Sequence, residues 1–370
     1  MMPVQYHEGK FPPQNMDWKR LIPLLGPAAA SLARYDGMLA AIPNPEVLLS
    51  PLTTQEAVLS SRIEGTQATM GEVLEFEAGH EPVSNERRED IHEILNYRAA
   101  MKRAEDLLKI LPFSLRVIRE AHVVLLEGVR GQNKAPGEFR RIPNWIGPPG
   151  CTIEDAHYIP VSAEKLPEFM GRWESFAYAP YPDVLVQLAL MHAEFEALHP
   201  FLDGNGRLGR MMIPLYLWQR GMIQRPMFYI SAYFEAHRDQ YYDRLLAVSR
   251  DDDWTGWCQF FLAAIKIQAE DNLKKAQDIL KLYEEMKNRL PQLTHSQFAI
   301  RALDWLFSQP IFNSSAFIDS SEIPKPTAHR ILSILEKNNI LKVLVPGSGR
   351  RSAVLVFPKL LNIAEGKEIV

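Results

Sequence analysis

The residues with the clearest chemical potential lie between His199 and Arg210, in the string His-Pro-Phe-Leu-Asp-Gly-Asn-Gly-Arg-Leu-Gly-Arg. His199 can accept a proton near neutral pH, and Asp203 offers the hard oxygen ligand that Mg²⁺ prefers. Arg207 and Arg210 are three residues apart, so on a helix they are neighbours that can hold phosphate oxygens through bidentate hydrogen bonds. A base, a metal ligand and two arginines are the groups that phosphoryl or nucleotidyl transfer requires.

Two glycines in the same string make it able to surround an anion. Gly204 and Gly206 permit positive φ and leave backbone N–H groups uncovered at the start of the next helix, where the helix dipole also favours negative charge. The segment from Gly204 to Gly209 matches G-x-G-x-x-G, but it follows a predicted helix rather than a strand, which argues against a dinucleotide-binding site. The sequence contains no G-x-x-x-x-G-K-[ST], so a P-loop enzyme is excluded.

Two predicted helices must position this string. Apolar residues recur at spacings of three and four from Pro182 to Leu198, with Pro182 suited to the first helical turn. A second helix is predicted from Arg207 to Arg220, where Gly221 would end it. The candidate chemistry therefore lies on the loop that joins these two helices.

The whole string resembles the motif of the Fic family, H-P-F-x-[D/E]-G-N-[G/K]-R-x-x-R, at every fixed position. The resemblance covers residues 114–266 as a catalytic core and extends more loosely over the N-terminal helices. It implies a mainly α-helical fold and the transfer of AMP from ATP to a hydroxyl group of a protein. His199 would take the proton from that hydroxyl, Asp203 would hold Mg²⁺ on the α- and β-phosphates, and Arg210 would pair with the γ-phosphate. The residues that would cradle the phosphates are Gly204, Asn205, Gly206 and Arg207.

The resemblance also implies a flap over the site and a pocket for adenine. Residues 141–147 and 156–160 are short β-like runs on either side of a Pro-Pro-Gly turn, which predicts a β-hairpin. This hairpin, with Ile146 and Gly147, is similar to the family's flap, which holds the target residue as an edge strand. Tyr229 and the pair Tyr241-Tyr242 lie where relatives line the adenine pocket. The alternative for these tyrosines is a place in the hydrophobic core.

A second motif, Ser60-Ser-Arg-Ile-Glu-Gly65, matches the inhibitory sequence [S/T]-x-x-x-E-[G/N] of Fic proteins. Ser60 and Glu64 are four residues apart and share one helix face, and Gly65 would end the helix. A carboxylate in the last turn is unfavourable for the helix dipole, so a cation from elsewhere would compensate it. The resemblance indicates Arg210 as that cation, which would deny Arg210 to the γ-phosphate. The alternative is an exposed glutamate before a helix-ending glycine.

The chain divides by pattern into three regions: residues 1–110, 111–275 and 290–370. The first is expected to be an N-terminal helical region that carries the inhibitory motif, and the second is expected to be the Fic catalytic core. The helices predicted outside the site loop are Pro51 to Glu64, Glu86 to Leu108, Ser114 to Gly128, and one or two helices over Asp253 to Met286.

The third region has the order of a winged helix-turn-helix domain. Helices are predicted over residues 297–307, 313–320 and 327–337, followed by a hairpin formed by residues 341–345 and 352–357. Nine Lys and Arg residues against six Asp and Glu residues give this region a modest positive charge. Target recruitment or assembly is therefore favoured over DNA binding, because DNA-binding domains are often far more basic. The side chains expected to face a DNA groove are Lys325, Thr327, His329, Arg330, Arg350 and Arg351.

Composition and charge set further limits. A formal net charge of -4 provides no overall attraction to nucleic acid or anionic lipid. The two cysteines, Cys151 and Cys258, exclude a disulfide scaffold and are typical of a reducing compartment. The N-terminal residues lack a signal-peptide pattern, and no apolar stretch approaches the roughly 18 residues of a membrane span. We therefore expect a cytoplasmic protein without membrane contact.

These observations lead to three hypotheses about the function. The leading one is a protein adenylyltransferase that uses ATP and Mg²⁺, acts on Ser, Thr or Tyr of a target protein and of itself, and is restrained by Glu64. Family relatives often form homodimers, so the resemblance implies a homodimer for this chain as well. The second reading is removal of AMP from a modified protein, with Glu64 aligning a water molecule. The third is a DNA-binding regulator whose core only senses nucleotide, which the intact His199 and Asp203 disfavour because sensing needs no base.

Overall fold

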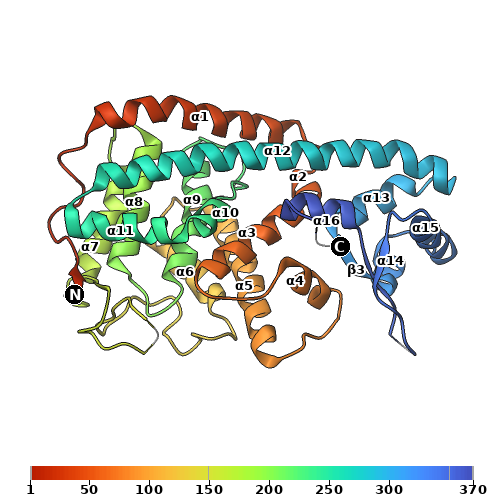
Figure 1. Ribbon diagram of the computed structural model, residues 1–370, viewed down its shortest axis with the longest axis horizontal. Helices are drawn as coiled ribbons and strands as arrows, with labels where there is room; N and C mark the ends of the chain where they lie inside the picture. Colours follow the sequence, from red (N-terminus) through yellow and green to blue (C-terminus); the bar gives the residue numbers. More distant parts are fainter. Residues whose placement is uncertain (1, 149, 350, 369–370) are drawn as a thin grey trace. The chain divides into compact units, whose positions relative to one another are not determined.

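The computed structural model describes residues 2–148, 150–349 and 351–368, and these residues form a mainly helical fold, as expected (Figure 1). None of the helices in these ranges combines the length and apolar character needed to cross a membrane. The helices are α1 (Trp18–Ala41), α2 (Pro45–Leu48), α3 (Ser50–Ile63), α4 (Met70–Glu77), α5 (Asn85–Leu108), α6 (Leu115–Leu125), α7 (Leu166–Tyr178), α8 (Val184–Leu198), α9 (Asn205–Gln219), α10 (Ser231–Ala236), α11 (Arg238–Asp251), α12 (Trp254–Thr294), α13 (Ala299–Ser308), α14 (Ser314–Ser320), α15 (Lys325–Lys337) and α16 (Pro358–Glu365). The strands are β1 (Val4–Gln5), β2 (Tyr158–Ile159), β3 (Ile311–Asn313), β4 (Lys342–Val345) and β5 (Val354–Val356).

Packing groups the chain into two compact units whose segments alternate along the sequence. The first unit consists of Met1–Asp36, Leu59–Gly65 and Asn96–Glu270. The second consists of Gly37–Val58, Thr66–Leu95 and Asp271–Val370. These two units differ from the three consecutive regions expected from the sequence pattern, and those three regions stay a prediction. All the residues of the two sequence motifs belong to the first unit.

Helix α8 is the central element of the first unit and packs against α7 and α9. Its buried residues include Gln187, His192 and Glu194 as well as the apolar positions, so the helix is enclosed on every side. Two buried indoles fix it further: Trp257 Nε1 donates to Ala189 O at 2.7 Å, and Trp173 Nε1 donates to Met191 O at 2.8 Å. A rigid, buried helix therefore leads into the loop that begins at His199.

The N-terminus of α8 differs slightly from the prediction. The helix begins at Val184 rather than at Pro182, and Asp183 is its N-cap. Asp183 Oδ1 accepts hydrogen bonds from Leu185 N at 2.8 Å and from Val186 N at 3.0 Å. The cap satisfies amides that would otherwise lack a partner in the first turn.

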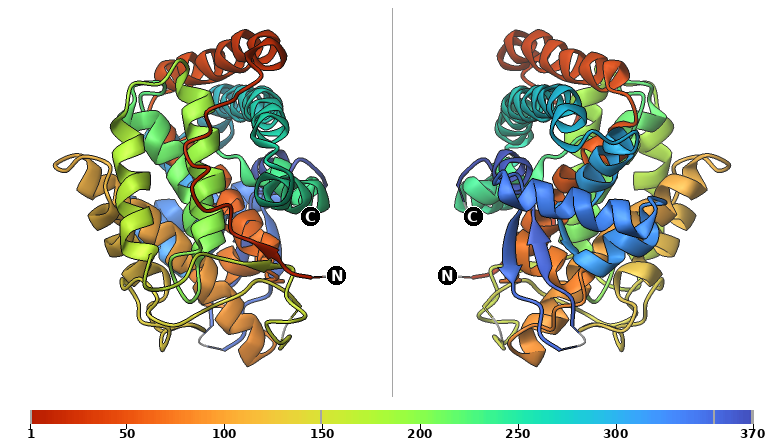
Figure 2. Two further views of the ribbon diagram at one scale, coloured as in Figure 1. Left: turned by 90° about the vertical axis from the view of Figure 1, so that its left-hand side faces the viewer. Right: turned by 90° about the vertical axis from the view of Figure 1, so that its right-hand side faces the viewer.

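The expected hairpin before α7 is only a single bridge. Ile146 N donates to Tyr158 O at 2.9 Å, and Ile146 O accepts from His157 N at 2.8 Å, but no regular ladder continues from this pair in the described residues. The prolines at 143 and 148 cannot donate to a ladder, which limits its extent; Pro149, at the predicted turn, lies outside the described residues. Tyr158 and Ile159 instead form β2, which pairs in parallel with β1 (Figure 2, left).

The N-terminal segment that supplies β1 is also tied to buried polar groups. His7 Nε2 lies 2.8 Å from Glu194 Oε2, and His7 Nδ1 lies 2.7 Å from Ser249 Oγ. Tyr6 OH donates to Glu194 Oε1 at 2.6 Å. These contacts connect the segment to α8 and α11, a connection that no pattern in the sequence predicted.

In the second unit the C-terminal elements follow the predicted order of three helices and a hairpin. Helices α13, α14 and α15 precede β4 and β5, which pair antiparallel (Figure 2, right). An additional strand, β3, pairs antiparallel with β5, so the sheet order is β3-β5-β4. The assignment of this region as a winged helix stays a prediction, and Arg350, expected on the wing, lies outside the described residues. The segment expected as one or two helices over residues 253–286 belongs, from Trp254 onward, to the single helix α12.

The cap of α8 yields a stability prediction. Asp183→Ala should lower the free energy of unfolding by about 1 kcal/mol, because two amides of the first turn lose their acceptor. Asp239→Ala is the matched control, since Asp239 lies in the first turn of α11 without being its cap, and it should have a smaller effect. Urea unfolding followed by tryptophan fluorescence measures both changes; equal effects of the two variants would contradict the role of the cap.

Candidate active site

The loop from His199 to Gly204 is defined by backbone conformation at both ends. His199 is the C-cap of α8 in the left-handed region, with φ 46° and ψ 61°, and Gly204 is the N-cap of α9, with φ 76°. Between them, Asn205 Oδ1 accepts from Phe201 N and Asn205 Nδ2 donates to Phe201 O, both at 2.8 Å. The side chain of Asn205 therefore holds the turn together, and only its backbone is available to a ligand.

Arg140, which the sequence did not single out, holds the end of α8 from outside the loop. It is buried, and its Nε donates to His199 O at 3.0 Å while its Nη2 donates to Leu198 O at 3.3 Å and to Val161 O. Asn144 Nδ2 also donates to His199 O at 3.3 Å. Burial lowers the pKa of Arg140 to about 10, which leaves it charged at neutral pH. The left-handed backbone at His199 is thus fixed by side chains from the preceding segment.

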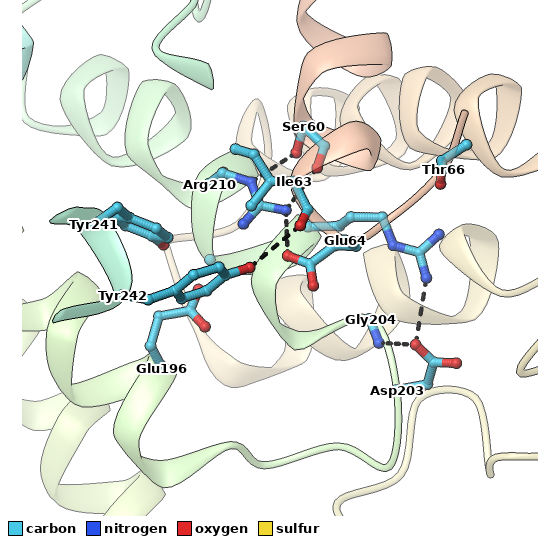
Figure 3. A network of polar contacts seen from close by, with 12 residues as sticks. Ser60, Ile63, Glu64, Thr66, Glu196, Asp203, Gly204, Arg210, Tyr241 and Tyr242 are labelled. Carbon is cyan, nitrogen blue, oxygen red and sulfur yellow. Dashed lines mark hydrogen bonds and ion pairs between the residues drawn. The ribbon is translucent and has the colours of Figure 1, made fainter. Parts of the chain in front are cut away.

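Arg210 is the most buried charged group of the site, with 1% of its side chain exposed. Its Nη2 donates to Glu64 Oε1 at 2.7 Å and to Ser60 O at 2.8 Å, and its Nε donates to Ser60 Oγ at 3.0 Å (Figure 3). The structure therefore brings Ser60 and Glu64 of the inhibitory motif together with the last arginine of the loop motif.

Glu64 lies against the first turn of α9. A Cβ atom at Gly206 would be 2.1 Å from Glu64 Oε1 and 3.0 Å from Arg210 Nη1, so only glycine permits this approach. Burial raises the pKa of Glu64, but Arg210, Arg207 and His199 together lower it below its usual value. A charged carboxylate thus occupies the helix N-terminus at which an anion is most favoured. Gly65, the residue after it, has φ 106°, which lets the chain turn away.

Asp203 points away from this pair and is partly open to solvent. Its Oδ1 accepts from Gly204 N at 2.6 Å and from Arg207 Nη2 at 3.4 Å, and 39% of its side chain is exposed (Figure 3). No group of three or more His, Cys, Asp or Glu residues that could hold a metal ion occurs among the described residues. A single carboxylate fits Mg²⁺ that arrives with phosphate oxygens, because that ion keeps most of its ligands from water and phosphate.

A cavity of about 460 Å³ lies beside Glu64 and Arg210, a size typical of small-molecule sites. Ile146 and Gly147, predicted on the flap, and Tyr241 and Tyr242 belong to its wall, whereas Tyr229 is buried but does not line it. The lining of this cavity also does not include four residues of the loop motif, namely Asp203, Gly204, Asn205 and Arg207. The lining residues are Glu64, Ile146, Gly147, Pro148, His157, Tyr158, Ala193, Glu196, Ala197, His199, Gly206, Arg210, Arg238, Tyr241, Tyr242, Asp243, Leu245 and Leu246.

Two titratable groups of the cavity are neutral at pH 7. Burial lowers the pKa of His199 to about 4, against the opposing effect of Glu64, so its imidazole is free to accept a proton. Burial raises the pKa of Glu196 to about 8, with Glu64 adding to the shift and Arg210 opposing it. Glu196 Oε1 is buried without a hydrogen-bond partner in the described residues. Sequence reasoning missed Glu196, although it lies in the last turn of α8, three residues before His199.

These features define a mainly helical protein with a site suited to a phosphate-bearing ligand. Arg210 and the start of α9 attract an anion, the neutral imidazole of His199 lines the same cavity, and tyrosine and leucine side chains form part of its wall. Residues 22–106 match the model of the Fic/DOC family N-terminal region, and residues 112–217 match the model of the Fic/DOC family itself. The chain belongs to the Fic/DOC family.

Sequence relatives carry the name protein adenylyltransferase Fic. The chain is 27% identical to that protein of Drosophila willistoni over 166 residues, which cover 43% of this chain and 30% of the relative. It is 27% identical to that of Aedes aegypti over 205 residues, which cover 51% of this chain and 36% of the relative. The chain thus spans about a third of the length of these relatives.

Solved structures show the same fold at low identity. A Fic family protein from Desulfovibrio desulfuricans G20 matches with a TM-score of 0.61 at 19% identity, over 94% of this chain and 98% of that one. A Fic domain containing signaling protein from Bacteroides thetaiotaomicron VPI-5482 matches with a TM-score of 0.53 at 20% identity, over 69% and 97% of the two chains.

The environment of His199 predicts its titration. NMR of the imidazole should give a pKa near 4, and Glu64→Gln should lower that pKa further, because the negative charge of Glu64 raises it. Glu127→Gln, which changes an exposed glutamate in the turn after α6, should leave the titration unchanged. A midpoint at or above 6.5 would show that the ring is not buried as described.

Proposed function

We propose that this protein transfers AMP from ATP to a hydroxyl group of a target protein, and that Glu64 restrains the reaction. The observation that carries the proposal is the arrangement of a neutral imidazole at His199 beside the buried guanidinium of Arg210, on a helix N-terminus next to an apolar cavity. The names of the sequence relatives support the same activity.

The arrangement suits an attack at the α-phosphorus. His199 accepts the proton of the target hydroxyl, the hydroxyl oxygen forms a bond to the α-phosphorus, and the bond from that phosphorus to the bridging oxygen breaks. Pyrophosphate leaves with the electron pair, and AMP stays on the target. Arg207, Arg210 and the amides at the start of α9 bind the phosphate oxygens on which negative charge is concentrated. Asp203 would hold the Mg²⁺ of the nucleotide, which supplies charge neutralisation on the phosphates.

The remaining cavity fits the nucleoside. Tyr241 and Tyr242 offer aromatic faces, and Leu245 and Leu246 offer apolar walls next to the flap residue Ile146. Tyr241 is held in place from behind: His192 Nδ1 lies 3.1 Å from Gly209 O and must donate to it, so His192 Nε2, at 2.8 Å, accepts from Tyr241 OH. An adenine ring bound here would place its phosphates toward α9.

Glu64 restrains this reaction by competing for Arg210. Its carboxylate is charged and already satisfies the guanidinium, so a terminal phosphate must displace it. The γ-phosphate that would otherwise fix the triphosphate then lacks its main partner, and the α-phosphorus is not aligned with His199. A separate part of the proposal concerns the C-terminal elements, from α13 to β5. These elements would bind the target protein and bring it to the site.

Removal of AMP from a modified protein is a second candidate at the same site. The observation that favours it is that the charged carboxylate of Glu64 lines the cavity, with 36% of its side chain exposed, and so can orient a water molecule. Release of AMP from a pre-modified target by the unaltered protein, lost in Glu64→Gly, would support this activity over simple inhibition.

Removing the restraint gives the test of the leading proposal. Glu64→Gly should raise the incorporation of labelled AMP from ATP by at least about tenfold, because one lost charge-assisted hydrogen bond corresponds to roughly that factor. Adding His199→Ala to this variant should abolish incorporation, because it removes the imidazole proposed to accept the proton of the target hydroxyl. Glu127→Gly, an exposed glutamate in the turn after α6, is the control and should leave the basal rate unchanged. No AMP transfer by Glu64→Gly to itself or to proteins of a cell extract would contradict the proposal.

A further inference from the structure

His122 on α6 is completely buried and links the segment around Gly137 to the site loop. Its ring stacks on Phe201 at a centroid distance of 3.9 Å and an interplanar angle of 21°. Nδ1 lies 2.8 Å from Gly137 N, and Nε2 lies 3.0 Å from Asp203 O. The residue does not line the cavity, and the proposed chemistry does not use it.

These two contacts determine which ring nitrogen carries the proton. The backbone N–H of Gly137 can only donate, so Nδ1 accepts and has no hydrogen. A carbonyl oxygen can only accept, so Nε2 carries the hydrogen and donates it to Asp203 O. His122 is therefore held as one neutral tautomer by two backbone groups that cannot exchange roles.

The carbonyl of Asp203 belongs to the peptide plane that also contains the N–H of Gly204. In a trans peptide these two groups point in opposite directions. His122 holds the carbonyl on its own side, and the N–H of Gly204 therefore points to the other side, where it donates to Asp203 Oδ1 at 2.6 Å. That bond fixes the carboxylate that is proposed to meet the metal.

The local backbone by itself would not keep the Asp203–Gly204 peptide in one orientation. Gly204 has φ 76° and lacks a Cβ, so its backbone offers little resistance to rotation of the peptide plane. A rotated peptide would turn the carbonyl oxygen toward Asp203 Oδ1 and toward the phosphates, where two negative groups repel. It would also leave the buried Nε2–H of His122 without an acceptor, which makes the rotated state costly only while His122 is present.

We propose that His122 is a positioning residue that locks the Asp203–Gly204 peptide, and that it thereby aims the Asp203 carboxylate at the metal ion of the nucleotide. This inference rests on the proposed use of a magnesium nucleotide. His122 lies on α6, 81 positions before Asp203 in the sequence. In this proposal it controls the orientation of Asp203, the metal ligand.

The test measures binding of Mg-ATP by calorimetry in the Glu64→Gly background, where Arg210 is available. His122→Phe keeps an aromatic ring on Phe201 but removes both hydrogen bonds, and it should weaken Mg-ATP binding about tenfold. Without Mg²⁺ the loss for ATP should be under about threefold, because the lock acts on the metal ligand. Phe139→Leu changes another ring packed on Phe201, at 5.3 Å, and is the control that should not alter binding.

Two further variants apply if His122→Phe fails to fold. The side chain of Gln reaches as far as Nε2 and can donate to Asp203 O, whereas that of Asn reaches only as far as Nδ1 and can accept from Gly137 N. His122→Gln should therefore bind Mg-ATP more tightly than His122→Asn. Equal affinities of these two variants, or an equal loss with and without Mg²⁺ in His122→Phe, would overturn the inference. Failure of Glu64→Gly itself to bind Mg-ATP would instead contradict the proposed function.

Discussion

The arrangement of the site depends on one electrostatic constraint: the buried guanidinium of Arg210 needs an anionic partner. Arg210 has almost no exposure, and Ser60 supplies only neutral acceptors to it. An uncompensated buried charge costs several kcal/mol, so the guanidinium must be paired with a carboxylate or with a phosphate. In the state described here the partner is Glu64, at 2.7 Å. Under the proposed function, Glu64 and the terminal phosphate of ATP would compete for this one guanidinium.

Other parts of the first unit keep this site positive and rigid. The carboxyl group of Glu196 and the imidazole of His199 are both neutral at pH 7, so neither cancels nor adds to the charge of the arginines. Arg140 fixes the end of α8 and His122 fixes the start of α9, both through backbone carbonyls of the loop. The loop therefore needs little reorganisation when a ligand arrives, which is the condition for strong electrostatic stabilisation of a transition state.

The sequence predicted the loop, its two helices and the Glu64–Arg210 pair, because those signals are local or belong to a specific motif. It did not predict α1, since Pro23 and Pro27 lie inside that helix, although buried Leu21, Ala28 and Leu32 keep the helical spacing. The predicted hairpin is limited to the antiparallel bridge between Ile146 and Tyr158, because prolines cannot donate to a longer ladder. Arg140 and His122 could not be found, because each is an isolated residue whose contacts are with distant segments. Glu196 was missed although it lies in the last turn of α8, just before His199.

The most direct measurement is a crystal structure of Glu64→Gly with Mg²⁺ and an ATP analogue that cannot be cleaved at the α-phosphorus. The account predicts the terminal phosphate on Arg210, the metal ion on Asp203, the adenine between Tyr241 and Tyr242 and the flap, and the α-phosphorus facing His199. Phosphates bound away from Arg210, or a nucleotide outside the cavity with His199 still enclosed by protein, would contradict it.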